Sequence, residues 1–146
     1  MQTESQVVAV GHVIQLAVAP VFLLTGVSGL LAVLTSRLAR IIDRARTLED
    51  RLSLVSEADQ NRIHDELGSL SVRARWINTA VSLCTLCALL ICAVIVALFV
   101  GAFFSTDVSA AIGVLFTSAM LALFSGLVSF LREVYVATRN LRIGPH

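Results

Sequence analysis

The sequence predicts an all-α integral membrane protein with three transmembrane helices and a cytoplasmic helical hairpin that extends from the first two. Three observations support this fold class. The 146-residue chain is 57% hydrophobic, and its mean hydropathy of +0.87 is well above the balance of soluble domains. Its long apolar segments contain no charged residue. Between the first two segments, apolar residues recur at helical spacing.

Three apolar segments are long enough to cross a bilayer, and we treat residues 1–146 as one membrane domain. The first, residues 13–34, supplies about 22 residues, which at about 1.5 Å per residue cover the roughly 30 Å hydrocarbon core. Its N-terminal flank carries Glu4 and no basic residue, so we expect a retained helix and not a signal peptide. The second span, residues 77–104, is longer and should tilt. The third, residues 110–131, follows so short a connection that these two spans must be antiparallel.

Arginine is distributed asymmetrically along the chain, which contains no lysine. Eight arginines lie between Arg37 and Arg75, and three follow the last span. None precedes the first span or lies in the loop around Asp107. Because basic residues are retained on the cytoplasmic flanks of spans, the N-terminus and the Asp107 loop should lie outside the cell. The central block and the C-terminus should then be cytoplasmic.

The central block, residues 37–76, is predicted to form a helical hairpin. Each half carries apolar residues at steps of three and four, which is a heptad seam. A break at Ser56–Asp59, with the spacing of a helix N-cap, separates the halves. No glycine or proline lies between Leu30 and Gly68, so both helices should continue from a span. The tail, residues 132–146, should begin by extending the third helix. The seam residues are Leu38, Ile41, Ala45, Leu48, Leu52 and Val55, then Ile63, Leu67, Leu70, Ala74 and Ile77.

Composition and motifs argue against several classes of function. The net charge is +1 and acids are interspersed among the arginines, so we expect no nucleic-acid partner. The chain has no nucleophile motif, no glycine-rich phosphate loop and no H-E-x-x-H, so we expect no enzymatic activity, no catalytic residues and no cofactor. Cys84 and Cys87 form a C-x-x-C without a second pair, and the histidines lie in different segments. We therefore interpret the cysteines as packing residues and expect neither a disulfide nor a metal site.

The spans contain small neutral polar residues but no Asp, Glu, Lys or Arg, which disfavours a proton relay or an ion-coupled carrier. Two interpretations of the polar residues stay open. They can form a packing ridge, as Ser118, Ala122 and Gly126 would, or they can line a water path within an oligomer. Pro20 should kink the first span beside Phe22. The candidate pore or packing residues, here called the polar stripe, are Thr25, Ser28, Gly29, Ser82, Thr85, Thr117 and Ser125.

Charged residues gather at the cytoplasmic edge of the spans. One interpretation is a set of anchoring arginines that extend toward the membrane interface beside Trp76. Another is that Asp43 and Glu133 bridge arginines of neighbouring helices and so fix the helix register. A third assigns the arginines to an ion path or to contact with an anionic lipid. These residues, here called the edge cluster, are Arg37, Arg40, Asp43, Arg44, Arg73, Arg75, Arg132 and Glu133.

Three strings in the sequence carry a resemblance to a known family. Ser36–Arg46 reads S-R-L-A-R-I-I-D-R-A-R after a span that contains proline, Arg73–Trp76 precedes a span rich in serine and cysteine, and Phe130–Glu133 follows the last span. They resemble a family of small bacterial membrane proteins described as domain of unknown function 2721, and the resemblance covers nearly the whole chain. The resemblance implies a three-helix protein of the bacterial inner membrane, and it implies no particular activity.

The heptad seams and small-residue ridges favour a symmetric homo-oligomer in the lipid bilayer. Our leading hypothesis is that this oligomer conducts ions or small solutes along its symmetry axis. The opposing hypothesis is a non-conducting scaffold or adaptor whose cytoplasmic hairpin docks a partner. Oligomeric state separates the two, because three helices alone cannot enclose a pore.

Overall fold

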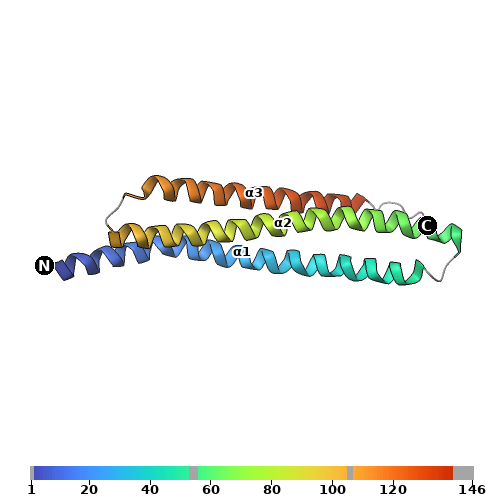
Figure 1. Cartoon of the computed structure of the whole chain (residues 1–146), viewed down its shortest axis with the longest axis horizontal. Helices are drawn as coiled ribbons and strands as arrows, with labels where there is room; N and C mark the ends of the chain where they lie inside the picture. Colours follow the sequence, from blue (N-terminus) through green and yellow to red (C-terminus); the bar gives the residue numbers. More distant parts are fainter. Residues whose placement is uncertain (1, 53–55, 105–106, 140–146) are drawn as a thin grey trace. The chain divides into compact units, whose positions relative to one another are not determined.

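The computed structural model describes residues 2–52, 56–104 and 107–139 (Figure 1). Nearly all of them belong to three helices, α1 (Gln2–Leu52), α2 (Glu57–Phe104) and α3 (Ser109–Arg139). Each helix contains a stretch that is long and apolar enough to cross a membrane. The chain is therefore all-helical with three candidate membrane spans, as predicted.

α1 and α2 continue well beyond the apolar segments that they contain. α1 is 51 residues long and α2 is 48 residues long, and neither is interrupted. This confirms the continuity predicted from the lack of glycine and proline between Leu30 and Gly68. α1 also continues through Pro20, although proline has no N–H to donate to the carbonyl one turn earlier. α3 likewise extends past the predicted third span, as far as Arg139.

Short polar segments precede α2 and α3. The carbonyl of Ser56 accepts hydrogen bonds from the backbone N–H groups of Asp59 and Gln60, both at 3.0 Å, as an N-cap residue does. The predicted break between the two halves of the central block is thus confirmed. Before α3, Asp107 accepts hydrogen bonds from the hydroxyl and the backbone N–H of Ser109. These two bonds lower the pKa of the Asp107 carboxyl, because they favour its charged form.

The chain divides into two units, Met1–Leu31 with Leu83–Phe124, and Ala32–Ser82 with Ser125–His146. The core of the first unit comes from its apolar segments. Val27 is 2% exposed, and Cys84 and Cys87 are completely buried. Other large apolar side chains of this unit stay exposed, among them Phe22 at 75% and Phe124 at 67%. An apolar surface of this kind is what contact with lipid tails requires.

The second unit is built on the predicted heptad seam. Ile41 and Leu48 of α1 are 6% and 5% exposed, and Leu70 and Ile77 of α2 are 6% and 0% exposed. The other seam residues that the structure describes are half-buried, while Val55 lies outside the described residues. Burial of apolar surface contributes about 25 cal/mol per Å² and is the main attraction between helices that lie in water. The predicted seam is therefore confirmed by burial.

α3 carries a buried face of small residues that ends in a carboxylate. These residues recur at steps of three and four and are Ala119, Ala122, Gly126, Ser129 and Glu133. The predicted ridge began at Ser118, but Ser118 is exposed and Ala119 is buried in its place. The difference is one residue, about 100° around a helix, which is enough to turn a side chain from the core to the surface.

Candidate functional site

Glu133 is the buried carboxylate of the edge cluster. It is 1% exposed, and it follows Ser129 by one turn on the buried face of α3. In the sequence it comes two residues after the last apolar segment, directly behind Arg132. A charged group removed from water destabilises the fold unless it is paired and hydrogen-bonded. The side chains that pair with Glu133 therefore determine the role of the edge cluster.

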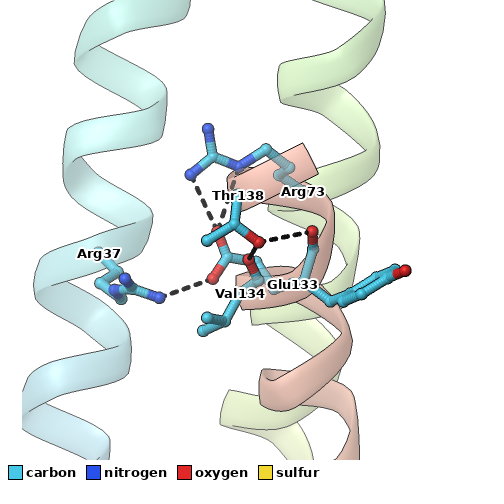
Figure 2. Close-up of polar contacts among 6 residues, drawn as sticks. Arg37, Arg73, Glu133, Val134 and Thr138 are labelled. Carbon is cyan, nitrogen blue, oxygen red and sulfur yellow. Dashed lines mark hydrogen bonds and ion pairs between the residues drawn. The ribbon is translucent and has the colours of Figure 1, made fainter. Parts of the chain in front are cut away.

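Two arginines from different helices bind Glu133 (Figure 2). Arg37 of α1 donates through Nη1 to Oε2 at 2.8 Å. Arg73 of α2 donates through Nε and Nη2 to Oε1, at 3.2 Å and 3.0 Å. Both carboxylate oxygens are thus occupied, and one residue of α3 is joined to both other helices. We call these three residues the Glu133 triad.

The triad specifies geometry more than it adds stability. The side chains of Arg37 and Arg73 are 36% and 27% exposed, so both guanidinium groups stay partly hydrated. Ion pairs that are partly removed from water gain Coulomb energy but lose hydration, and the two terms largely cancel. A charge-assisted bond from each of two helices to one carboxylate, however, is satisfied by few helix placements. The triad therefore fixes the register of the three helices in the second unit.

Two aromatic rings reinforce these contacts. The guanidinium carbon of Arg37 lies 5.3 Å from the ring centroid of Phe130, one turn before Glu133. The guanidinium carbon of Arg132 lies 5.2 Å from the ring centroid of Trp76 on α2. Cation–π contacts at such distances contribute about 0.5–1 kcal/mol at exposed sites. Trp76 thus contacts α3 through Arg132.

A second ion pair links α1 and α2 further along the second unit. Arg44 donates through Nε and Nη2 to Oε1 of Glu66, at 3.1 Å and 2.8 Å. The two side chains are 57% and 42% exposed, so this pair contributes little to stability. Glu66 also lies four residues after Arg62 on its own helix, a spacing at which ion pairs form. The structure instead pairs it across to the neighbouring helix.

The structure brings together most of the predicted edge cluster and corrects one assignment. Asp43 was expected to bridge arginines as Glu133 does, but it is exposed, and no ion pair to it occurs within the described part of the chain. Its place is taken by Glu66, which the sequence did not single out for that role. Arg75 is exposed and takes no part in the described ion pairs.

The arginines of the triad also border a cavity of about 260 Å³ within the second unit. Arg37, Arg40 and Arg44 contribute from α1, and Arg73 contributes from α2. Arg40 is exposed and forms no ion pair among the described residues. Glu133 is the carboxylate that lines the cavity, beside the apolar side chains of Ile41 and Leu70. The cavity is therefore strongly basic on most of its wall.

Comparison with known proteins gives a family and no further relative. A family model described as a protein of unknown function, DUF2721, matches residues 17–143. The chain belongs to the DUF2721 family. No curated protein and no solved structure matches it. The match spans all three helices and every residue of the Glu133 triad, so the predicted resemblance is confirmed, and this family membership assigns no activity.

All seven residues of the polar stripe in this DUF2721 protein are exposed. The hydroxyl of Thr25 donates to the carbonyl of Val21 at 3.2 Å, and that of Ser28 donates to the carbonyl of Thr25 at 2.7 Å. Serine and threonine hydroxyls bonded in this way need no other partner inside a membrane. A Cβ atom built on Gly29 would meet nothing within 4 Å. These residues therefore lie on the surface of the single chain.

The cysteines of this DUF2721 protein are free thiols. Cys84 and Cys87 are buried in the core of the first unit, and Cys92 is exposed. Within the described residues, no group of three or more His, Cys, Asp or Glu side chains is placed to hold a metal ion. Among the described residues, the charged side chains that could serve a function together are thus mainly the arginines around Glu133.

Proposed function

We propose that the protein is a homo-oligomeric scaffold of the bacterial inner membrane that holds a rigid helical hairpin in the cytoplasm. In this proposal the N-terminus and the Asp107 turn lie outside the cell, while residues 37–76 and the C-terminus lie inside. The observation that carries the proposal is the Glu133 triad, which joins all three helices just beyond the apolar segments.

A scaffold must present its extension in one conformation, and the triad supports this role. The buried seam of Ile41, Leu48 and Leu70 gives the hairpin an apolar core of its own. The triad then sets the register from which both hairpin helices leave the apolar segments. A partner would meet a preformed surface, so its binding would not have to order the hairpin. Preorganisation of this kind is the physical basis for docking by a hairpin.

The chemistry of the spans also favours a scaffold over an ion-coupled carrier. The apolar segments hold no Asp, Glu, Lys or Arg, whereas proton relays and coupled carriers use such groups at mid-depth. The hydroxyls of Thr25 and Ser28 are bonded within α1. They do not require a water path for their own hydrogen bonding.

Conduction along a symmetry axis is the second candidate, and the exposure of the whole polar stripe favours it. A pore between copies needs its lining residues on the surface of the single chain, and all seven stripe residues lie there. The same exposure suits a packing interface between copies. Both candidates therefore require an oligomer and differ in what passes through it.

Native mass spectrometry of the detergent-solubilised protein, followed by ion flux from liposomes, separates these two functions. We expect an oligomer that releases neither potassium nor chloride above the rate of empty liposomes. A flux that falls when Thr25→Leu or Ser28→Leu blocks the stripe would replace the scaffold with the pore. A monomer would contradict both candidates, because each depends on several copies.

The substitution Gly29→Leu tests whether the stripe is the contact between copies. Gly29 is exposed and a Cβ atom there would meet nothing within 4 Å, so we expect the fold to persist while the fraction of oligomer falls. Gly113→Leu is the matched control, because Gly113 on α3 is equally unobstructed and lies outside the stripe. Equal oligomer fractions in the two variants would place the contact elsewhere.

A further inference from the structure

The cavity beside the Glu133 triad has an excess of positive charge that the described residues leave unmatched. Four guanidinium groups border it, from Arg37, Arg40, Arg44 and Arg73. Two carboxylates offset them, Glu133 on the wall and Glu66 through its bond to Arg44. Two positive charges therefore remain uncompensated around one cavity. Like charges gathered in this way repel one another, and an anion between them removes that repulsion.

The arginines retain hydrogen-bond donors that the described contacts do not use. A guanidinium group has five N–H donors. Glu133 takes one from Arg37 and two from Arg73, and Glu66 takes two from Arg44. Arg40 gives none to any described carboxylate. A ligand can therefore bind these arginines without displacing Glu133, so the triad and the ligand can coexist.

We propose that this cavity binds a phosphate group. A tetrahedral phosphate presents several oxygens, which the planar forks of two or more arginines can bind at once. The cavity volume of about 260 Å³ far exceeds the roughly 10–15 Å³ that one water molecule needs, so the cavity has room for a group several times larger than water. The chemistry is shared by the headgroup of an anionic phospholipid and by free inorganic phosphate.

The position of the cavity favours the lipid as the source. Arg37 lies three residues beyond the first apolar segment, and Arg132 directly follows the third. Arg132 stacks on Trp76, and tryptophan is enriched where spans reach the headgroups. Arg37 and Arg73, which lie within four residues of the apolar segments, are thus placed near the level where lipid phosphates occur. The proposal holds for a scaffold or for a pore, because it does not depend on the number of subunits.

The test compares Arg40→Gln with Arg46→Gln. Arg40 borders the cavity and lies outside the triad, so its replacement leaves the Glu133 contacts in place. Arg46 is an exposed arginine of the same helix that does not border this cavity, and its replacement removes the same charge. Melting temperatures of the two variants in detergent should be no lower than that of the wild type. Any difference in ligand binding then reports the cavity and not the fold.

In the lipid arm, native mass spectrometry measures retention of phosphatidylglycerol and of phosphatidylcholine added to the detergent. We expect preferential retention of phosphatidylglycerol by the wild type and by Arg46→Gln. Arg40→Gln should weaken it about tenfold, which corresponds to about 1.4 kcal/mol and to one charge-assisted hydrogen bond.

In the second arm, thermal unfolding is followed with inorganic phosphate and with chloride at equal ionic strength. If phosphate alone raises the melting temperature, and Arg40→Gln abolishes the rise, the proposal holds with a free phosphate as the ligand. The proposal is overturned if Arg40→Gln and Arg46→Gln weaken binding equally, or if neither phosphatidylglycerol nor phosphate is preferred. Either result would make the arginines a general basic surface.

Discussion

Glu133 is placed where the side chains before it on the same helix face are small. Gly126 and Ser129 precede it on the buried face of α3. Arg37 and Arg73 bring their charges to the carboxylate from the two other helices. A single residue therefore decides whether three helices share one register. No other described residue of the edge cluster contacts two helices in this way.

Replacing Glu133 by glutamine should destabilise the protein much more than the same change at Glu66. Glu133→Gln leaves two guanidinium groups facing one another without their carboxylate, and we expect a loss of about 2–3 kcal/mol. Glu66→Gln removes one half of an exposed pair, and we expect a loss below about 1 kcal/mol. Thermal unfolding in detergent measures both. Equal losses would mean that Glu133 does not organise the helices.

Glu133 could be predicted from the sequence, whereas Asp43 could not be excluded. Glu133 directly follows Arg132 at the end of an apolar segment, a position where an acid needs a partner. Asp43 lies among arginines in the same way, but it is about 120° around the helix from Arg37 at 100° per residue. Which face of α1 meets its neighbours depends on packing across helices. For the same reason, the partner of Arg44 became known only from the structure.

At the scale of the helices, the second unit has a buried apolar seam, and apolar residues of the same type lie exposed beside it. Ile41 is 6% exposed and its neighbour Ile42 is 40% exposed, although the two side chains are identical. Ile41 is a seam position and Ile42 is not, because positions in contact with a partner helix recur at steps of three and four. The same spacing indicated the seam of α2, where Leu70 and Ile77 are buried.

The pair Ile41→Ala and Ile42→Ala measures how much the seam stabilises the second unit. Ile41→Ala opens a cavity in a packed seam and should cost about 2–4 kcal/mol. Ile42→Ala removes the same atoms from a more exposed position and should cost less than about 1 kcal/mol. Hydrogen exchange of residues 32–52 and 57–82, read by mass spectrometry, should rise in the first variant alone. Equal protection in both would show that the seam does not hold these helices together.

Helix lengths were more predictable than helix faces. The apolar segments, the lack of glycine and proline between Leu30 and Gly68 and the break at Ser56 indicated most of the helix boundaries, although not the start of α1 at Gln2. The ridge on α3 was less predictable, since Ser118 and Ala119 are both small and only packing chooses between them. α1 continues through Pro20, where a kink was predicted. The local sequence thus predicts which residues form a helix, whereas contacts between helices determine which face of the helix is buried.

At the scale of the whole molecule, the distribution of arginine predicts how the chain lies across the membrane. Asn61 belongs to the arginine-rich central block, and Ser109 follows the arginine-free turn at Asp107. Positive flanks stay in the cytoplasm, so these two residues should lie on opposite sides. The apolar segment 77–104, which is part of the candidate span Asp59–Phe104, lies between them.

Cysteine labelling tests this topology. Ser109→Cys and Asn61→Cys are introduced one at a time into a chain whose Cys84, Cys87 and Cys92 are replaced by alanine. A membrane-impermeant maleimide should label Ser109→Cys in intact cells and Asn61→Cys only after lysis, because both positions are exposed. The reverse pattern would invert the topology. Labelling of both positions in intact cells would mean that α2 does not cross the membrane.

The order in which a ribosome makes the chain gives the Glu133 triad one more consequence. Synthesis proceeds from the N-terminus, so Arg37 and Arg73 emerge long before Glu133. Until α3 is inserted, the two arginines have no shared carboxylate, and the ends of α1 and α2 lack the bonds that set their register. The last helix therefore completes the assembly of the first two. A chain that stops before Glu133 would carry every residue of the hairpin seam and still lack the contact that joins the three helices.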